Sequence, residues 1–167
     1  TFTEMTSIRL KTRKNSFLLF RGELTSISEG WRVLFVFSFH VLVLALNGKI
    51  KEVGEKIFAS NGKEVDFASA LESCEEAGGT LATPMNEEEN KAILGIVKQY
   101  NRYAYLGIKE CQASGQFQCI NGMPLNYTKW RKYEPNGKGT EKCVEMYTDG
   151  SWNDRKCNLR RLTICEF

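Results

Sequence analysis

The sequence predicts an α+β domain over residues 58–167, preceded by an apolar helix and a basic N-terminal arm. Two segments, beginning after Asp66 and after Asn86, carry apolar side chains at the spacing of amphipathic helices. Short strand-like pieces, broken by Gly, Asn and Pro, follow Tyr103. Six cysteines, none of them in a CxxC pair, are typical of a small disulfide-bonded domain in an oxidising compartment.

The basic residues are concentrated in the arm. Residues 1–32 hold six Lys or Arg against three Asp or Glu, whereas residues 33–167 hold seventeen of each. The main domain is therefore electrically balanced and shows no footprint of nucleic-acid binding, so we expect no nucleic-acid partner. The arm has no repeat or clear periodicity, and we expect it to be weakly ordered.

Residues 33–57 have the spacing of a coiled-coil neck. Apolar side chains alternate in steps of three and four, as at the a and d positions of heptads. Because most of these side chains are β-branched, the pattern favours a homotrimer. Val33–Leu46 has a second interpretation as a signal-peptide core or membrane anchor, although a full span needs about 20 residues. The seam positions are Val36, Phe39, Val43, Leu46, Ile50, Val53 and Ile57.

The first part of the domain is expected to contain short strands around Asn61-Gly62 and then a helix capped by Asp66. That helix should end at Gly78-Gly79. Its expected inner face is Phe67, Ala70, Leu71, Cys74 and Ala77.

A second helix is expected after Asn86. The triplet Glu87–Glu89 has two interpretations, a metal cluster or the favourable acidic first turn of a helix, and the second is preferred. Strands are expected at the segments AYLGI, CVEMY and LTICEF. The inner face of this helix should be Ile93, Ile96, Val97 and Tyr100.

The composition argues against an enzyme. His40 is the single histidine and lies in the apolar run VLFVFSFHVLVLAL, where a packed or solvent-facing role is expected. A glycosidase pair needs one carboxyl kept protonated in an apolar pocket. The candidate carboxylates Glu134 and Glu141 instead lie among amides and lysines in a polar loop.

Oxygen-bearing side chains gather near the C-terminal end. Calcium takes six to eight oxygen ligands from carboxylates, amides, backbone carbonyls and water. The glycine-rich segment 137–139 lets the chain curl so that Glu134 and Glu141 face one centre. An amide can also use its oxygen on a metal and its NH2 on a hydroxyl. The sequence thus predicts a Ca²⁺ site formed by Glu134, Asn136, Glu141, Asn153 and Asp154.

These residues resemble the carbohydrate-recognition domain of C-type lectins, and more narrowly that of the surfactant collectins. The segments that carry the resemblance are VGEKIF, AGGTLATP, EEENKAI, YLGI, NYTKW, CVEMYTDGSWND and RLTICEF, and it covers roughly residues 46–167. It implies two helices with looped antiparallel sheets, disulfides Cys74–Cys165 and Cys143–Cys157, and a cis bond at Glu134-Pro135.

The resemblance also implies a function. It predicts a secreted, extracellular lectin of airway surfactant that binds mannose-type glycans on microbial surfaces through Ca²⁺ and also binds surfactant phospholipids in innate defence. Sugar hydroxyls would be held by Glu134, Asn136, Glu141 and Asn153. Aromatic side chains suit a lipid headgroup boundary, and the candidate lipid contacts are Tyr100, Tyr103 and Tyr147, with core packing as their alternative. The alternative function is a structural or lipid-interaction module that binds no sugar.

The chain departs from collectins in two ways. It has no Gly-X-Y repeat, and Cys111 and Cys119 are additional to the four expected cysteines. The turn signal Ser114-Gly115 predicts a local bridge between them, with a bond between chains as the alternative. Asn126 begins an N-glycosylation sequon.

Overall fold

The computed structural model describes residues 8–11, 16–19 and 49–167, and the chain divides into the units Thr1–Ser38 and Phe39–Phe167. In the first unit, β1 (Ile8–Lys11) pairs antiparallel with β2 (Ser16–Leu19), which is regular structure inside the arm expected to be weakly ordered. The predicted seam and the signal or anchor interpretation over residues 33–48 lie outside the described residues. Neither helix in the described part is long and apolar enough to cross a membrane.

The end of the predicted neck helix is a β-hairpin, so the helix prediction was wrong for residues 50–57. β3 (Ile50–Val53) pairs antiparallel with β4 (Lys56–Ala59), with Val53 opposite Lys56. Gly54, in the two-residue turn, has a φ of +60°, a left-handed conformation that a helix interior does not contain. Val53 packs against the core from this hairpin. The described domain therefore begins at residue 49 with strands.

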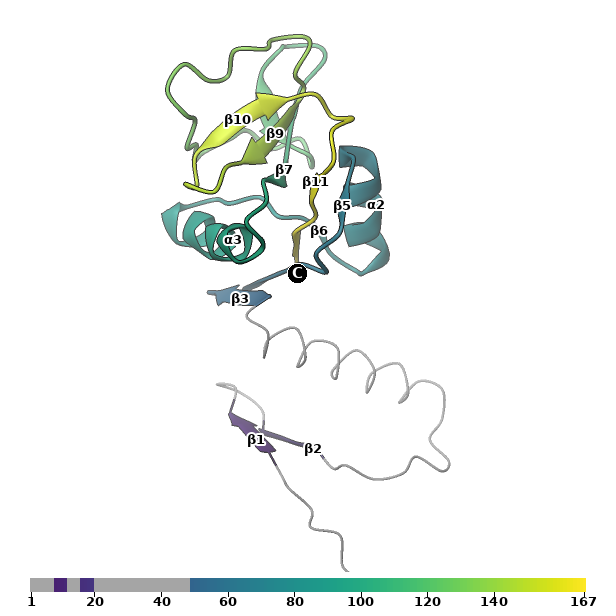
Figure 1. Ribbon diagram of the computed structural model, residues 1–167, viewed down its shortest axis with the longest axis vertical. Coiled ribbons are helices and arrows are strands. Elements are labelled where there is room, and N and C mark those ends of the chain that lie inside the picture. Colours follow the sequence, from purple (N-terminus) through teal and green to yellow (C-terminus); the bar gives the residue numbers. More distant parts are fainter. Residues whose placement is uncertain (1–7, 12–15, 20–48) are drawn as a thin grey trace, which may run out of the picture. The chain divides into compact units, whose positions relative to one another are not determined.

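Within residues 49–167 the strands form two sheets (Figure 1). One has the order β3-β4-β12-β6. The other has the order β10-β9-β7-β11-β5, with β8 paired to β7. Their remaining strands are β5 (Glu64–Val65), β6 (Thr80–Leu81), β7 (Ala104–Glu110), β8 (Phe117–Cys119), β9 (Cys143–Met146), β10 (Trp152–Arg155), β11 (Arg161–Leu162) and β12 (Cys165–Glu166).

Both predicted helices are present and are capped as expected. Asp66 accepts a hydrogen bond from the Ser69 N–H at 3.0 Å at the start of α2 (Phe67–Glu76). Asn86 does the same for Glu89 at 2.9 Å at the start of α3 (Glu87–Tyr100).

The acidic triplet at the start of α3 has structural partners. Glu89 pairs with Lys56 at 3.0 Å and accepts from the Met85 N–H. Glu87 pairs with Lys129. All three glutamates of the triplet lie in the first turn of α3, which confirms the predicted helix-start role.

The core lies between the helices and the larger sheet. Figure 1 shows α2 and α3 on opposite sides of the strands β7 and β11, and β9 and β10 lie at the end of the domain away from β3. Ile93, Ile96 and Val97 of α3 are fully buried, as predicted. Two disulfides, Cys74–Cys165 and Cys143–Cys157, join α2 to β12 and the start of β9 to the segment after β10.

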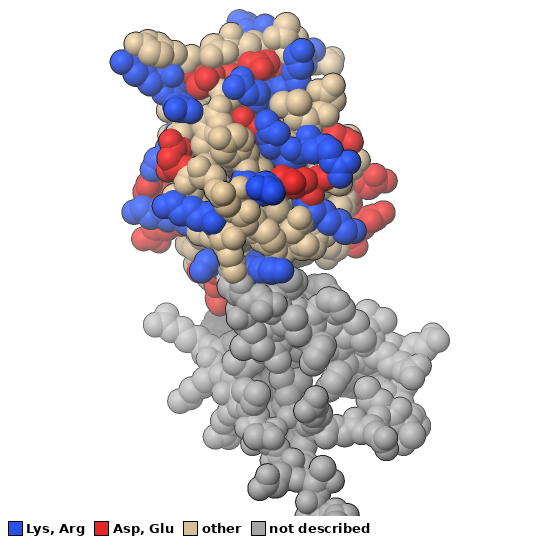
Figure 2. Space-filling view, in the orientation of Figure 1, with Lys and Arg blue, Asp and Glu red and all other residues tan. Residues whose placement is uncertain are grey.

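Positive and negative side chains are mixed on the surface of this domain. On the face in Figure 2 the Lys and Arg side chains alternate with Asp and Glu over the described residues. This distribution agrees with the equal counts of acidic and basic residues, seventeen of each, over residues 33–167.

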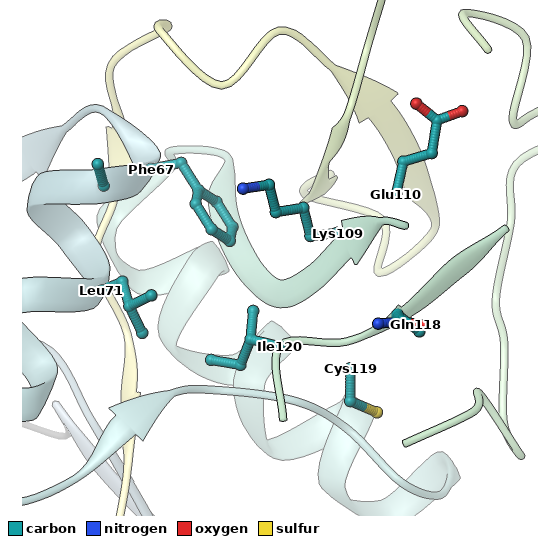
Figure 3. A pocket seen from close by; sticks show the side chains of 8 residues that line it. Phe67, Leu71, Lys109, Glu110, Gln118, Cys119 and Ile120 are labelled. Carbon is teal, nitrogen blue, oxygen red and sulfur yellow. The ribbon is translucent and has the colours of Figure 1, made fainter. Parts of the chain in front are cut away.

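The predicted bridge between Cys111 and Cys119 is absent, and both thiols are free. The β7–β8 hairpin pairs Cys119 with Ile108, three residues along β7 from Cys111, and the Cys111 N–H donates to Gln116. The register therefore holds the two sulfurs apart. Figure 3 shows Cys119 at a hollow of about 270 Å³ that is also lined by Phe67 and Leu71 of α2 and by Ile120.

The two free thiols should react differently in the native protein. Cys111 is half-buried, and hydrogen bonds from Ser114 and Ala113 lower the pKa of its thiol. Burial raises the pKa of Cys119, which is only 3% exposed. We expect Cys111 to alkylate faster than Cys119 in the native protein, and Cys119 to react mainly after unfolding. Mass spectrometry after timed iodoacetamide treatment measures both, and equal rates would contradict the assignment.

Candidate functional site

The candidate site lies where the long segment before β9 meets β10. Asn153 pairs with Glu145 across the β9–β10 ladder. Because side chains alternate along a strand, Asn153 and Arg155 project from one face of β10, together with Glu145 of β9. The pairing with β9 therefore fixes the backbone position of Asn153, a predicted ligand.

Trp152 fixes β10 in the core. Its side chain is fully buried, and its indole N–H donates to the Asn90 side-chain oxygen at 2.8 Å. The Trp152 backbone N–H donates to Lys129, and its carbonyl accepts from the Arg131 N–H. The backbone is therefore held in place immediately before Asn153 and Asp154.

Glu134 lies directly against Asn153. The Glu134-Pro135 bond is cis, as the resemblance implies. In the amide orientation that satisfies its neighbours, the Asn153 NH2 group donates to both Glu134 carboxylate oxygens, at 2.6 and 2.8 Å. Desolvation, a hydrogen bond with Asp154 and the charge of Asp154 raise the pKa of Glu134 to about 7. The Glu134 carboxyl is thus partly shielded from water and lies beside a second carboxylate, that of Asp154.

Asp154 ties the loop to the sheet. Its side chain is fully buried, and its carboxylate accepts from the backbone N–H groups of Asn136 at 3.0 Å and Gly137 at 2.7 Å. The Asn136 side chain itself is exposed. Asp154 therefore orients the segment that carries Glu134 and Asn136.

Glu141 is brought back toward the site by a tight loop. Its backbone N–H donates to the Gly137 carbonyl at 2.7 Å. A Cβ on Gly137 would lie 2.4 Å from the Glu141 side chain, so only glycine fits there. The buried Glu110 accepts from the Gly139 N–H at 3.0 Å and fixes the far side of the loop.

Two charged residues that the sequence analysis did not select also belong to the site. The Arg155 guanidinium lies 3.2 Å from Glu141 and 3.5 Å from Glu145. Glu145 is almost completely buried and is also paired with Arg161. Burial lowers the pKa of Arg155, but Tyr147, Glu141 and Glu145 outweigh it and raise that pKa, so Arg155 stays charged. Strand alternation around Asn153 was the signal that could have found Arg155, whereas Glu145 comes from the neighbouring strand β9.

The donor set has the chemistry that calcium prefers. Glu134 contacts both Asn153 and Asp154, and Glu141 is joined to Asn153 through Arg155. In the described part of the chain, no three His, Cys, Asp or Glu side chains form a metal-binding group by themselves. The amides Asn136 and Asn153 would therefore have to complete the set, which suits a hard, oxygen-binding cation.

The three tyrosines proposed for lipid contact are not brought together. Tyr103 and Tyr147 meet edge to face with ring centroids 4.6 Å apart, and the Tyr147 hydroxyl donates to Asn153 at 2.9 Å. Tyr100 lies elsewhere and packs against the core, with its hydroxyl 3.4 Å from the Ser60 carbonyl. Core packing, the alternative considered for these residues, applies to Tyr100. Asn126 of the sequon is exposed.

Comparisons with known proteins identify the family. The model of the "Lectin C-type domain" matches residues 63–167. The carbohydrate-recognition domain of the mouse scavenger receptor C-type lectin is 22% identical, with a TM-score of 0.63 over 71% of this chain and 93% of that one. The cow CD23 domain, solved with a GlcNAc2Man3 oligosaccharide, is 26% identical, with a TM-score of 0.63 over 71% and 92%. Herring type II antifreeze protein is 24% identical, with a TM-score of 0.64 over 71% and 95%. The chain belongs to the C-type lectin domain family.

Proposed function

We propose that this domain is a calcium-dependent lectin that binds mannose-type glycans. The observation that carries the proposal is the contact of Glu134 with Asn153 and Asp154 beside a loop that returns Glu141 to the same place. Domains of this family are in general binding modules, and disulfide-bonded lectin domains are typically extracellular.

The residues of the chain would act on two neighbouring sugar hydroxyls. Bound Ca²⁺ would supply coordination positions for those hydroxyl oxygens. The Glu134 and Glu141 carboxylates would accept the hydroxyl protons, and the Asn136 and Asn153 NH2 groups would donate to the hydroxyl oxygens. Asp154 would hold the ion and the backbone of the loop rather than the sugar.

The finer identity is part of this proposal. We infer a collectin of the surfactant protein A kind, secreted into airway surfactant, that binds microbial glycans and surfactant phospholipids and forms homotrimers through residues before the domain. The support is the set of sequence segments that resemble surfactant collectins, together with the exposed Tyr103 beside the site. Trimer formation would raise avidity for a surface that displays many glycans.

A second candidate is a module that needs no calcium and binds no sugar. Arg155 favours it, because its guanidinium already contacts oxygens of two proposed ligands, Glu141 and Asn153. One similar structure, at 26% identity and a TM-score of 0.64, is described as a calcium-independent type II antifreeze protein.

Calcium dependence separates the two candidates. We expect millimolar Ca²⁺, but not Mg²⁺, to raise the melting temperature and to permit binding to immobilised mannose that EDTA reverses. The matched control is the same assay with free galactose as competitor. A melting temperature that calcium leaves unchanged, without mannose binding, would reject the proposal and favour the second candidate.

Exchanging donor and acceptor in the Glu-Pro-Asn triplet should change the preferred sugar. The double variant Glu134→Gln with Asn136→Asp keeps the oxygens and total charge but reverses hydrogen-bond polarity. We expect calcium affinity to survive, while mannose binding weakens by about 1–3 kcal/mol and preference moves toward galactose. Competition with the two monosaccharides measures this change, and an undiminished mannose preference would show that the sugar binds elsewhere.

A further inference from the structure

Arg155 lies between two groups of oxygen atoms. On one side its Nη1 is 3.2 Å from Glu141 Oε1. The side-chain amide oxygen of Asn153 accepts from its Nε and Nη2, both at 3.0 Å. On the other side its Nε is 3.5 Å from Glu145 Oε1, and its Nη2 is 3.4 Å from the Tyr147 hydroxyl. Every donor nitrogen of this guanidinium therefore faces an acceptor of the site or of its supporting strand.

Two of these acceptors are atoms that the proposed ion would need. Lone pairs of Glu141 and Asn153 that point at the guanidinium are not available to Ca²⁺ at the same time. A guanidinium within about 3–4 Å of those oxygens would also repel a divalent cation held by them, in a partly buried place where screening is weak. Guanidinium and ion thus compete for the same oxygens.

Glu145 gives the guanidinium a second partner. Its carboxylate is about 1% exposed and is paired with both Arg155 and Arg161. Arg155 can therefore lose Glu141 and Asn153 without leaving its charge unpaired, since it keeps Glu145 and the Tyr147 hydroxyl.

We propose that Arg155 is a resident counter-cation of the candidate calcium site, which neutralises and orders the ligands of the metal-free protein and must release Glu141 and Asn153 for the ion to bind. The inference rests on the proposed function and names a residue that sets its calcium affinity without being a ligand. Arg155 should stabilise the metal-free form and weaken calcium binding. Both effects come from the same contacts.

The test compares the unchanged chain with the variants Arg155→Met, Arg155→Lys and Arg131→Met. Methionine keeps an apolar stem of similar length but removes the charge, and lysine keeps the charge without the fork of donors. Arg131→Met is the matched control, because that guanidinium lies over the Tyr147 ring, 5.0 Å from its centroid, and its removal changes net charge equally. Calorimetric calcium titration and melting in EDTA are measured for each.

We expect Arg155→Met to bind calcium about tenfold more tightly or better and to melt at a lower temperature in EDTA than the unchanged chain. Arg155→Lys should gain about threefold in affinity, and it decides the question if circular dichroism shows that Arg155→Met is unfolded. Arg131→Met should stay within about twofold of the unchanged chain.

The results separate this inference from the proposed function. Calcium binding by the unchanged chain with no gain in either Arg155 variant would overturn the inference alone. Binding by an Arg155 variant but not by the unchanged chain would support the counter-cation and reject a calcium-dependent function. An absence of calcium binding in all variants would overturn both, and a gain in Arg131→Met as large as in Arg155→Met would reduce the effect to net charge and overturn the inference.

Discussion

Replacing Asp154 by alanine should abolish both calcium binding and calcium-dependent binding to mannose. The substitution removes a proposed ligand and also the acceptor for two N–H groups, those of Asn136 and Gly137. Each donor left unsatisfied in a buried place costs about 1–3 kcal/mol, so the loop that carries Glu134 should also lose its fixed conformation. Calorimetric calcium titration and a mannose-surface assay measure the loss.

Asp149→Ala provides the control for this variant. Asp149 is exposed in the turn before β10, where it accepts from Ser151, and it contacts none of the proposed ligands. Asp149→Ala removes one negative charge, as Asp154→Ala does, and should leave calcium binding and mannose binding intact. Mannose binding that survives in Asp154→Ala would mean that the sugar does not depend on this site.

Removing the Cys74–Cys165 disulfide should give the largest loss of stability. The bond joins residues 91 apart in sequence. In the entropy model, closing so long a loop lowers the conformational entropy of the unfolded chain and so adds about 4–5 kcal/mol to the free energy of unfolding. The double variant Cys74→Ala with Cys165→Ala should therefore unfold at much lower urea concentration. At low temperature it should still bind calcium, because the bond joins α2 to β12 rather than supporting the site.

The second disulfide serves as the comparison. Cys143–Cys157 joins residues only 14 apart, for which the same model gives about 3 kcal/mol. Urea unfolding of the two double variants, each with the other disulfide intact, measures the difference. An equal or smaller loss on removing Cys74–Cys165 would contradict the loop-length argument.

Local chemistry made the helices of this domain predictable from the sequence. Asp66 and Asn86 were recognised as caps because their short polar side chains precede apolar residues at helical spacing, and each accepts the expected backbone N–H. The disulfides Cys74–Cys165 and Cys143–Cys157 came from family resemblance, since the cysteine positions alone allow many pairings.

The errors arose where spacing alone fits two structures. Ile50, Val53 and Ile57 satisfy a heptad, but tertiary pairing with β12 and the left-handed Gly54 select a hairpin. The turn signal near Ser114 correctly indicated a reversal of the chain, but it did not give the register that separates Cys111 from Cys119.

The candidate site was predictable only in part. Oxygen-bearing side chains at Glu134, Glu141 and Asp154 suggested a hard cation. The fold places Glu134 against Asp154 and joins Glu141 to Asn153 through Arg155, but the three carboxylates do not form a metal-binding group by themselves. Arg155 was not predicted, because its side chain offers no oxygen to a cation, although a period of two places it on the same face of the strand as Asn153. Its importance comes from Glu145, which lies across the ladder and which no local pattern connects to it.

The pairing of β12 with β4 has a practical consequence for how this protein should be attached in an assay. Phe167 exchanges two backbone hydrogen bonds with Ile57, so the last residue of the sequence is fastened into the sheet that also contains β3. In Figure 1 this sheet lies away from β9 and β10, whose neighbouring loops carry the candidate ligands. An affinity tag or fluorophore attached at residue 49 or after Phe167 would therefore join the domain on the side away from those loops.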